Sequence, residues 1–598
     1  MKKIILSTLA LVAVSMLSSC GEDKLDIAQK GVTPTENFYK TDADAEAALA
    51  AAYAQFATYV PGRGQAFINT PFKTMLNMPG DDVFAAGSNF GDNDHMGSLN
   101  EFRFDSGHDT TSQFYTGLFL ANYACNLVID NFKEGIVNPT NDGPRSPSAV
   151  SKQCVAEARV LRALIYFYLT ALWDTPPFID HVIAASELPV NCDVMETPMS
   201  HDDLMRWVAS ECESAVTDLT SRNGKTDKDG AVRVTKDFAY ALAGKAYLFV
   251  KDYTAAKTAL KKVIDSNNYD LVPGENYWQN FHIEGDCNEE KVFEINIEYN
   301  SGIGAWGGIN QRSSWMEANI WSWRADHFQA VPHSVYCGGA DGWGGLGVPQ
   351  WFGDEFFEND GHSPRFDATL KHIDDVVYNM TYQDSTLTQM PLEEKKKSTK
   401  IGIKDPNDGL YGESFWLPFK QLVKAEDCNA NYGNNVRLNN HVIMRYAEVL
   451  LLYAEACLQT NDQAGALESI NKIQKRAGSK TISASVDMDV LKKEKSYELW
   501  LEGCRFLDLV RWGDTSRAEK AGSDVPKLYD KLHKAPESGK TVTWEHGTEA
   551  DSRFYTISSH EAMDRGFKCG FVKGKHEHLP FPMTVMEKNP NLRQNLGW

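Results

Sequence analysis

Two stretches of this chain combine helical apolar periodicity with a pair of small residues twelve positions apart. The pairs are Gly244 with Ala256 in residues 236–265, and Ala454 with Ala466 in residues 442–477. In each stretch polar residues interrupt the periodicity between the small residues. Apolar residues that recur every three or four positions predict helices with one buried face, and small residues let two such helices approach closely. Both stretches therefore predict antiparallel helical hairpins.

A third hairpin is predicted over residues 152–219, with a long insert between its helices. Its first helix should end after Trp173, because Pro176 and Pro177 follow and proline disfavours helix before it. The twelve-residue spacing resembles the tetratricopeptide repeat, although the aromatic and proline positions of that repeat are incomplete. Generic helix pairs are the alternative. Stacked helix pairs can form one unit, so a chain of 598 residues need not contain several domains.

The first twenty residues predict export and lipid attachment. Lys2 and Lys3 precede an apolar run over residues 4–17, which is too short for a stable membrane span. Small residues then lead to Cys20, a pattern that resembles the bacterial lipoprotein cleavage box; an ordinary secretory signal is the alternative. We expect a signal peptide over residues 1–19 and a lipidated tether over 20–32. Cleavage would change the formal net charge from −21 to −23, and no later run reaches the length of a membrane helix.

Composition and motifs exclude several functions. The acidic balance argues against nucleic acid, which needs clustered basic residues. Residues 302–307 fit G-x-G-x-x-G after a strand-like run at 292–298, but no helix is predicted to follow, so a dinucleotide site is disfavoured. No metal-ligand spacing emerges, and the pair His576 and His578 is interpreted as surface. The ten cysteines other than Cys20 are scattered, which favours free buried thiols over a disulfide framework.

Tryptophan is concentrated in one irregular segment rich in glycine, residues 300–359. Six of the fourteen tryptophans lie there: Trp306, Trp315, Trp321, Trp323, Trp343 and Trp351. Long irregular segments in compact proteins are usually functional, and flat indole rings suit binding surfaces. Sugar rings can stack on such faces, while Asn310 and Gln311 could bind hydroxyl groups. We expect most of these indoles to be structural and two or three to touch a ligand.

Motifs along nearly the whole chain resemble the SusD/RagB family of outer-membrane lipoproteins of Bacteroidetes. They are LDI (25–27), ENFY (36–39), EARVLRA (157–163), IMRYAEVL (443–450) with YAEA (453–456), EGCRFLDLVRW (502–512), LPFP (579–582) and NPNLRQN (589–595). The acidic residues directly after Cys20 also resemble a surface-export signal of such lipoproteins. The chain is therefore identified as a member of this family.

The resemblance implies a mainly α fold. Tetratricopeptide-like helix pairs would form a scaffold, packed against a loop-rich half with a few short strands. Residues 33–598 would be one domain, with helical repeats at about 33–69, 108–270 and 440–515 and ligand-binding loops at about 70–107 and 300–359. The family positions Arg445, Glu448, Arg505 and Asp508 are interpreted as structural, in buried ion pairs or helix contacts.

The resemblance also implies a function without catalysis. The protein would capture an oligosaccharide or polysaccharide at the cell surface, for polysaccharide utilisation, and deliver it to a SusC-like TonB-dependent transporter in the outer membrane, acting as its lid. Candidate glycan-binding residues are Asp82, Phe84, Asn89, Phe90, Asn93, Trp306, Asn310, Gln311, Trp315, Trp321, Trp323 and Trp343. No cofactor is predicted; calcium near residues 92–94 has only weak support, because the spacing does not match an EF-hand loop.

Two other functions stay open from sequence. A RagB-like member would capture peptides, and peptide grooves also use aromatic residues. A surface glycoside hydrolase would need a carboxylate pair such as Asp81 and Asp82, although structural hydrogen bonding is the commoner role of such residues. The acidic charge fits a neutral ligand better than an anionic one.

Overall fold

The computed structural model describes most of the chain from residue 38 onward. The described ranges are 38–59, 71–85, 94–137, 144–296, 344–372, 416–420, 422, 425–427, 438–516, 545–546, 549–550 and 570–598. Cys20, the G-x-G-x-x-G stretch and most of the tryptophan-rich segment lie outside them.

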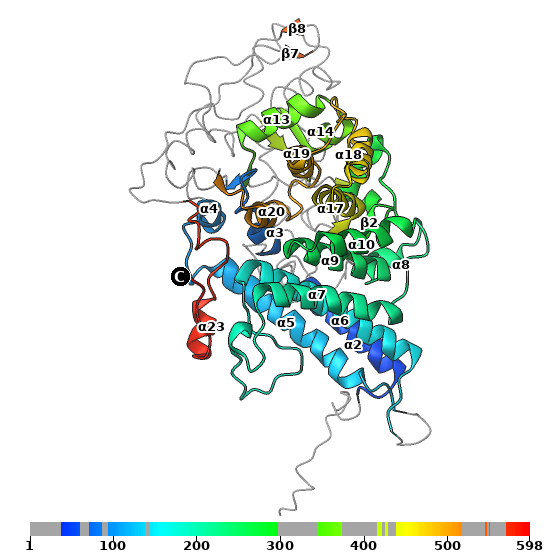
Figure 1. Cartoon of the computed structure of the whole chain (residues 1–598), viewed down its shortest axis with the longest axis vertical. Helices are drawn as coiled ribbons and strands as arrows, with labels where there is room; N and C mark the ends of the chain where they lie inside the picture. The colour runs from blue at the N-terminus through cyan, green and yellow to red at the C-terminus, as the bar shows by residue number, and fades with distance from the viewer. Residues whose placement is uncertain are drawn as a thin grey trace, which may run out of the picture.

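Helices dominate the described residues and pack on one another largely in chain order (Figure 1). The longer ones are α2 (Asp42–Tyr59), α5 (Asp109–Phe132), α6 (Ala149–Trp173), α7 (His201–Ala215), α9 (Lys236–Phe249), α10 (Tyr253–Asp265), α13 (Gln350–Asp360), α17 (Tyr446–Gln459), α18 (Gln463–Ala477) and α19 (Met488–Glu498). The shorter ones are α3 (Pro71–Asn77), α4 (Asp94–Asn100), α8 (Asp229–Val232), α14 (Pro364–Thr369), α20 (Arg505–Trp512) and α23 (Met583–Lys588). Such an array of neighbouring helix pairs matches the predicted scaffold.

The three predicted hairpins are confirmed as α6 with α7, α9 with α10, and α17 with α18. Side-chain caps begin these helices: Ser148 and Ser200 form capping boxes, and Asp462 accepts a hydrogen bond from the amide of Gly465. The small residues act as predicted. A Cβ atom added at Gly244 would lie 2.5 Å from Cγ of Leu260, so only glycine allows α9 and α10 this close.

One boundary of the predicted hairpins was wrong. Residues 442–445 were assigned to a helix but belong to strand β6 (His441–Arg445), and α17 begins only at Tyr446. β6 pairs antiparallel with β2 (Lys291–Ile295), which confirms the strand-like run that was predicted near 292–298. The pairing joins the two ends of the stretch between residues 295 and 441 and ties both ends to the helical array. The sequence of β6 was assigned to a helix because its apolar residues continue into those of α17 without a break.

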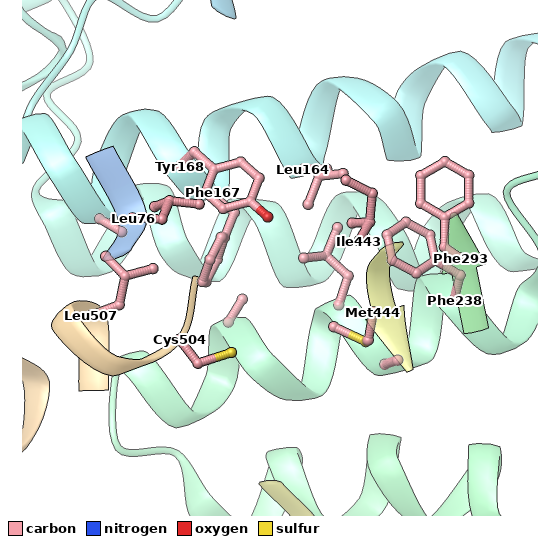
Figure 2. Packing of buried hydrophobic residues seen from close by; sticks show 14 of the residues in the cluster. Leu76, Leu164, Phe167, Tyr168, Phe238, Phe293, Ile443, Met444, Cys504 and Leu507 are labelled. Atoms are coloured by element: carbon pink, nitrogen blue, oxygen red, sulfur yellow. The ribbon is translucent and has the colours of Figure 1, made fainter. Parts of the chain in front are cut away.

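A continuous apolar core joins segments that are distant in sequence (Figure 2). Figure 2 shows Leu164, Phe167 and Tyr168 of α6 facing side chains of β2, β6 and the turn before α20. The structure describes seven cysteines, all as free thiols, and every one except Cys287 is buried in or beside this core. Burial raises the pKa of all seven thiols. Such thiols act as small apolar side chains rather than as nucleophiles.

A group of buried ion pairs, which we call the arginine hub, connects β6, α18 and the end of α19. The guanidinium of Arg445 donates to Glu290 (2.5 Å), to Glu498 (2.7 Å) and to both carboxylate oxygens of Glu502 (2.6 and 2.7 Å). Arg476 also binds Glu290 and Glu498. Burial raises the pKa of Glu498, but the charges of Arg476 and Arg445 outweigh it and hold that pKa below its usual range.

The other family positions also carry structural ion pairs, as predicted. Glu448 binds the buried ammonium of Lys245 at 2.7 Å. Asp508 accepts from Lys495 at 2.7 Å and from Arg511 at 2.8 Å. All of these charged groups are nearly or fully buried and paired, which is the condition under which charges persist in a protein interior.

Candidate functional site

The two segments that were predicted to bind ligand meet at one short strand pair. β1 (Phe84–Ala85) pairs antiparallel with β3 (Leu346–Gly347), with Phe84 opposite Gly347 and Ala85 opposite Leu346. β1 lies within the first predicted segment, about 70–107, and β3 lies within the second, about 300–359. This strand pair therefore joins the described parts of both segments, although about 260 positions separate them in sequence.

Close packing fixes the pair. Phe84 is only 1% exposed. A Cβ atom added at Gly347 would lie 2.1 Å from the ring of Phe84, so the ring rests directly on the glycine backbone. Phe84 was proposed as a sugar-binding residue, but in this structure its ring faces the interior and supports the strand pair. A stacking surface for a sugar ring would need exposure that Phe84 does not have here.

An ion pair and two hydrogen bonds hold the turn before β1. Asp81 accepts two hydrogen bonds from the guanidinium of Arg505 at the start of α20, at 2.6 and 3.0 Å. The indole of Trp500 donates to the carbonyl of Asp82 at 3.0 Å. Asn77, at the end of α3, accepts from the amide of Gly503 at 3.0 Å. The turn is thus fastened to the segment that links α19 with α20, and Asp81 has a structural partner.

Asp82 is the second predicted site residue that the structure describes, and it lies in the interior. Its side chain borders a small cavity between α19 and α20, near Ser496 and Trp512. Oδ2 has no hydrogen-bond partner among the described residues. Burial raises the pKa of Asp82 to about 7; the nearby charge of Arg505 lowers it and that of Asp81 raises it. Asp82 is therefore a buried carboxyl group whose pKa lies near neutral pH, in the turn before β1.

Helix α4 belongs to the same predicted segment, residues 70–107. Arg103 donates to Asp94 at 2.5 Å and to Glu101 at 2.6 Å, which joins both ends of α4. The side-chain amide of Asn100 donates to the carbonyls of Met78 and Val83, at 2.9 and 3.1 Å. Helix α4 is thus bound to the turn that precedes β1.

The remaining predicted site residues lie outside the described residues, and for them the prediction stays a prediction. They are Asn89, Phe90, Asn93, Trp306, Asn310, Gln311, Trp315, Trp321, Trp323 and Trp343. Of the tryptophan-rich segment, Trp351 is described: it lies half-buried on α13, edge-on to Phe352.

The sequence did not indicate the roles of Gly347 and Trp500. Gly347 supports the ring of Phe84, and Trp500 holds the turn before β1 together with Arg505. The signal for Arg505 was present, because it belongs to the EGCRFLDLVRW motif, but its partner Asp81 lies 424 positions away. A two-residue strand such as β3 leaves no alternating pattern to recognise.

Neither a metal centre nor a membrane helix emerges from the described ranges. No group of three or more histidine, cysteine or acidic side chains among them could hold a metal ion. Asp94, the described member of the weakly supported calcium stretch, binds Arg103 instead. No helix in the described part of the chain is both long and apolar enough to cross a membrane.

The model of the SusD family matches residues 289–598 of this chain, which is more than half of it. The chain belongs to the SusD family. A SusD-like protein of Formosa agariphila is 24% identical over 541 residues, covering 85% of this chain and 91% of the relative. A SusD-like protein of Bacteroides ovatus is 24% identical over 536 residues, covering 86% and 82%.

Solved structures confirm the SusD fold. A laminarin-binding SusD-like protein matches with a TM-score of 0.67 at 20% identity, covering 94% of this chain and all of the other. Surface glycan-binding protein A from Bacteroides thetaiotaomicron, in complex with laminarihexaose, matches with a TM-score of 0.67 at 19% identity, covering 93% and 100%. The predicted mainly helical scaffold with a few short strands is therefore confirmed.

Proposed function

We propose that this SusD-family protein captures an oligosaccharide or polysaccharide at the cell surface. The observation that supports the proposal is the strand pair β1 and β3, in which the described parts of the two predicted ligand-binding segments pair with each other next to the helical scaffold. Binding residues on loops held by a rigid scaffold are a common arrangement. Two proteins with the same fold are described as binding laminarin or laminarihexaose, which supports a glycan as the ligand class.

In this proposal, capture is followed by transfer. The protein hands its glycan to a SusC-like TonB-dependent transporter in the outer membrane and covers the mouth of that transporter as a lid. A lipid on Cys20 would keep the protein at the membrane surface beside its partner. The support for this part is membership of the SusD family together with the lipoprotein-like start of the sequence.

The first test is a binding screen of the purified mature protein against a panel of neutral polysaccharides, laminarin among them. We expect measurable affinity for at least one glycan, and a loss of about tenfold or more when Trp321 and Trp323 are both replaced by alanine, because desolvated aromatic anchors dominate binding energy. Trp278→Ala is the matched control, since this half-buried tryptophan lies on η5 (Gly274–Phe281), outside both loops. Unchanged affinity in the double variant would place the site elsewhere.

The same screen separates the alternatives. Binding of peptides with no glycan affinity would support a RagB-like peptide receptor instead. Release of reducing sugars, lost in Asp81→Asn, would support a hydrolase. The geometry opposes the latter, because Asp81 binds Arg505 and the Asp82 side chain is buried.

Lipid attachment has its own test. Replacing Cys20 by alanine is expected to move the protein from the membrane fraction to the soluble fraction, because without acyl chains no segment of the mature chain is predicted to hold it there. Cell fractionation with immunodetection measures this, and Cys192→Ala, which removes a buried thiol, is the control. Continued membrane association of the Cys20 variant would contradict lipidation at this residue.

A further inference from the structure

The tail segment, residues 570–598, lies against the stretch that follows α4. The amide of Gly570 donates to the carbonyl of Glu101 at 2.7 Å, and that of Met583 donates to the carbonyl of Ser106 at 2.8 Å. Figure 1 shows this segment, in red, passing beside α4 on its way to α23. The tail therefore contacts the described end of the first predicted ligand loop, more than 460 positions away in sequence.

Five aromatic rings, which we call the tail cluster, pack these two segments together: Phe102, Phe104, Phe571, His576 and Trp598. Trp598 stacks on Phe104, with ring centroids 5.2 Å apart and planes inclined by 28°. Phe102 meets Phe571 and His576, each at 5.3 Å. Aromatic pairs at such distances stabilise beyond their buried area, so the cluster binds the stretch after α4 to the tail.

Trp598 is held in one orientation. Its indole N–H is shared between the carbonyls of Lys575 and His578, at 3.2 and 3.0 Å. The ammonium of Lys575 lies 4.1 Å from the ring centroid on the ring face, within the range of a cation–π contact. With Phe104 stacked on the ring as well, Trp598 has fixed partners at its edge and on its face.

His576 is a ring of this cluster and not a surface residue, so the surface interpretation of His576 was wrong. It is 3% exposed, and its Nδ1 accepts a hydrogen bond from the amide of Val572 at 2.7 Å. Burial lowers the pKa of His576 to about 4. The imidazole is therefore neutral near pH 7 and behaves as an aromatic packing group.

The stretch that the tail covers is under backbone strain. Phe102 has a φ of 56°, in the left-handed region that a bulky side chain rarely adopts. Such a conformation persists only where the surroundings enforce it. Here the ring of Phe102 packs on Phe571 and His576 of the tail, and its centroid lies 6.2 Å from that of Phe506 on α20. The tail is thus one support that keeps Phe102, directly after α4, in place.

We propose that Trp598 is a positioning residue for ligand capture, acting through the tail cluster to hold α4 and thereby the end of the first ligand loop. The proposal rests on the proposed glycan-binding function.

Hydrogen exchange measured by mass spectrometry, together with glycan affinity, tests this role in the mature protein. In Trp598→Ala we expect amide exchange over residues 94–106 to rise about tenfold, because local opening becomes easier when packing is lost. Affinity for the glycan found in the panel should fall by about threefold to tenfold, since fewer molecules then hold the competent loop position. Trp598→Phe keeps the ring and should retain most of both properties.

Leu592→Ala is the matched control. Leu592 is also buried in the tail, but its neighbours Asn589 and Asn591 bind the carbonyls of Pro189 and Leu188, away from α4. Unchanged exchange over residues 94–106 in Trp598→Ala, or the same loss of affinity in Leu592→Ala, would overturn the proposal. If the wild-type protein binds no glycan, the proposed function fails, while the exchange measurement still decides whether Trp598 holds α4.

Discussion

Replacing Arg445 by methionine is expected to lower the free energy of unfolding by about 3–5 kcal/mol, because removing one partner leaves buried charges without compensation. Arg445 donates to the carboxylates of Glu290, Glu498 and Glu502 and also to the carbonyl of Glu498 at 2.6 Å. Arg445, Glu290 and Glu498 are fully buried. Methionine fills a similar volume but donates no hydrogen bond. In the variant the three carboxylates therefore lose the positive charge that stabilises them in the wild-type protein.

Urea unfolding followed by circular dichroism measures this effect. The control is Arg593→Met, since Arg593, in the tail segment, forms an exposed ion pair with Asp193. Exposed pairs contribute at most about 1 kcal/mol, so the control should unfold close to wild type. Two further cations reach the hub: Arg365 binds Glu498 at 3.1 Å, and Lys420 binds Glu502 at 2.6 Å. A loss below about 1 kcal/mol in Arg445→Met would show that these two cations and Arg476 compensate the buried carboxylates without Arg445. Because whole domains are stable by only about 5–15 kcal/mol, the expected loss is large enough to reduce the folded protein in cells.

Replacing Asp82 by asparagine is expected to stabilise the protein above pH 7 and to change little near pH 4. Burial raises the pKa of Asp82 to about 7, compared with an ordinary value of 3.8. Between these two pH values the folded protein binds a proton that the unfolded chain has released, so stability falls as pH rises through this window. Each pKa unit corresponds to about 1.4 kcal/mol, so the difference between variant and wild type should grow by roughly 4 kcal/mol from pH 4 to pH 8.

This expected dependence of stability on pH is opposite to that of most aspartates. In the usual case an ion pair lowers the pKa of the carboxyl group in the folded protein, so acid destabilises the protein. Unfolding free energies of wild type and Asp82→Asn, measured in urea from pH 4 to pH 8, test it. Asp514→Asn is the control, because this half-exposed carboxylate pairs with Lys492 at the surface and should contribute at most about 1 kcal/mol. A constant difference between Asp82→Asn and wild type across the whole range would show that Asp82 ionises normally in the folded protein.

The helical scaffold could be predicted because its signals are local. The small residues Gly244 and Ala454 lie within a few turns of the helices against which they pack, and caps such as Ser148 and Ser200 adjoin the helices that they begin. The motif residues Arg445 and Arg505 were assigned structural roles correctly, because charged residues within apolar runs can persist in the interior only when paired.

The parts that could not be predicted depend on contacts between distant segments. Nothing near Gly347 in sequence indicates that the ring of Phe84 rests on it. His576 stands in a run of lysines and glutamate that is typical of a surface, and the rings that bury it, Phe102 and Phe104, lie more than 470 positions away. Phe84 and Asp82 have residue types suited to binding sugars, yet local sequence does not report which side of a turn faces the interior.

The arginine hub also joins segments that lie far apart in sequence, which affects how fast the chain folds. Arg445 and Glu290 are 155 positions apart, and Arg476 and Glu290 are 186 apart. Non-local pairing of this kind slows folding, because the entropy of closing a long loop is lost before the contact stabilises the chain. Until these segments meet, their charged groups remain hydrated and oppose collapse of the apolar core around them. We therefore expect a chain with this topology to fold more slowly than one that has only contacts between neighbouring helices.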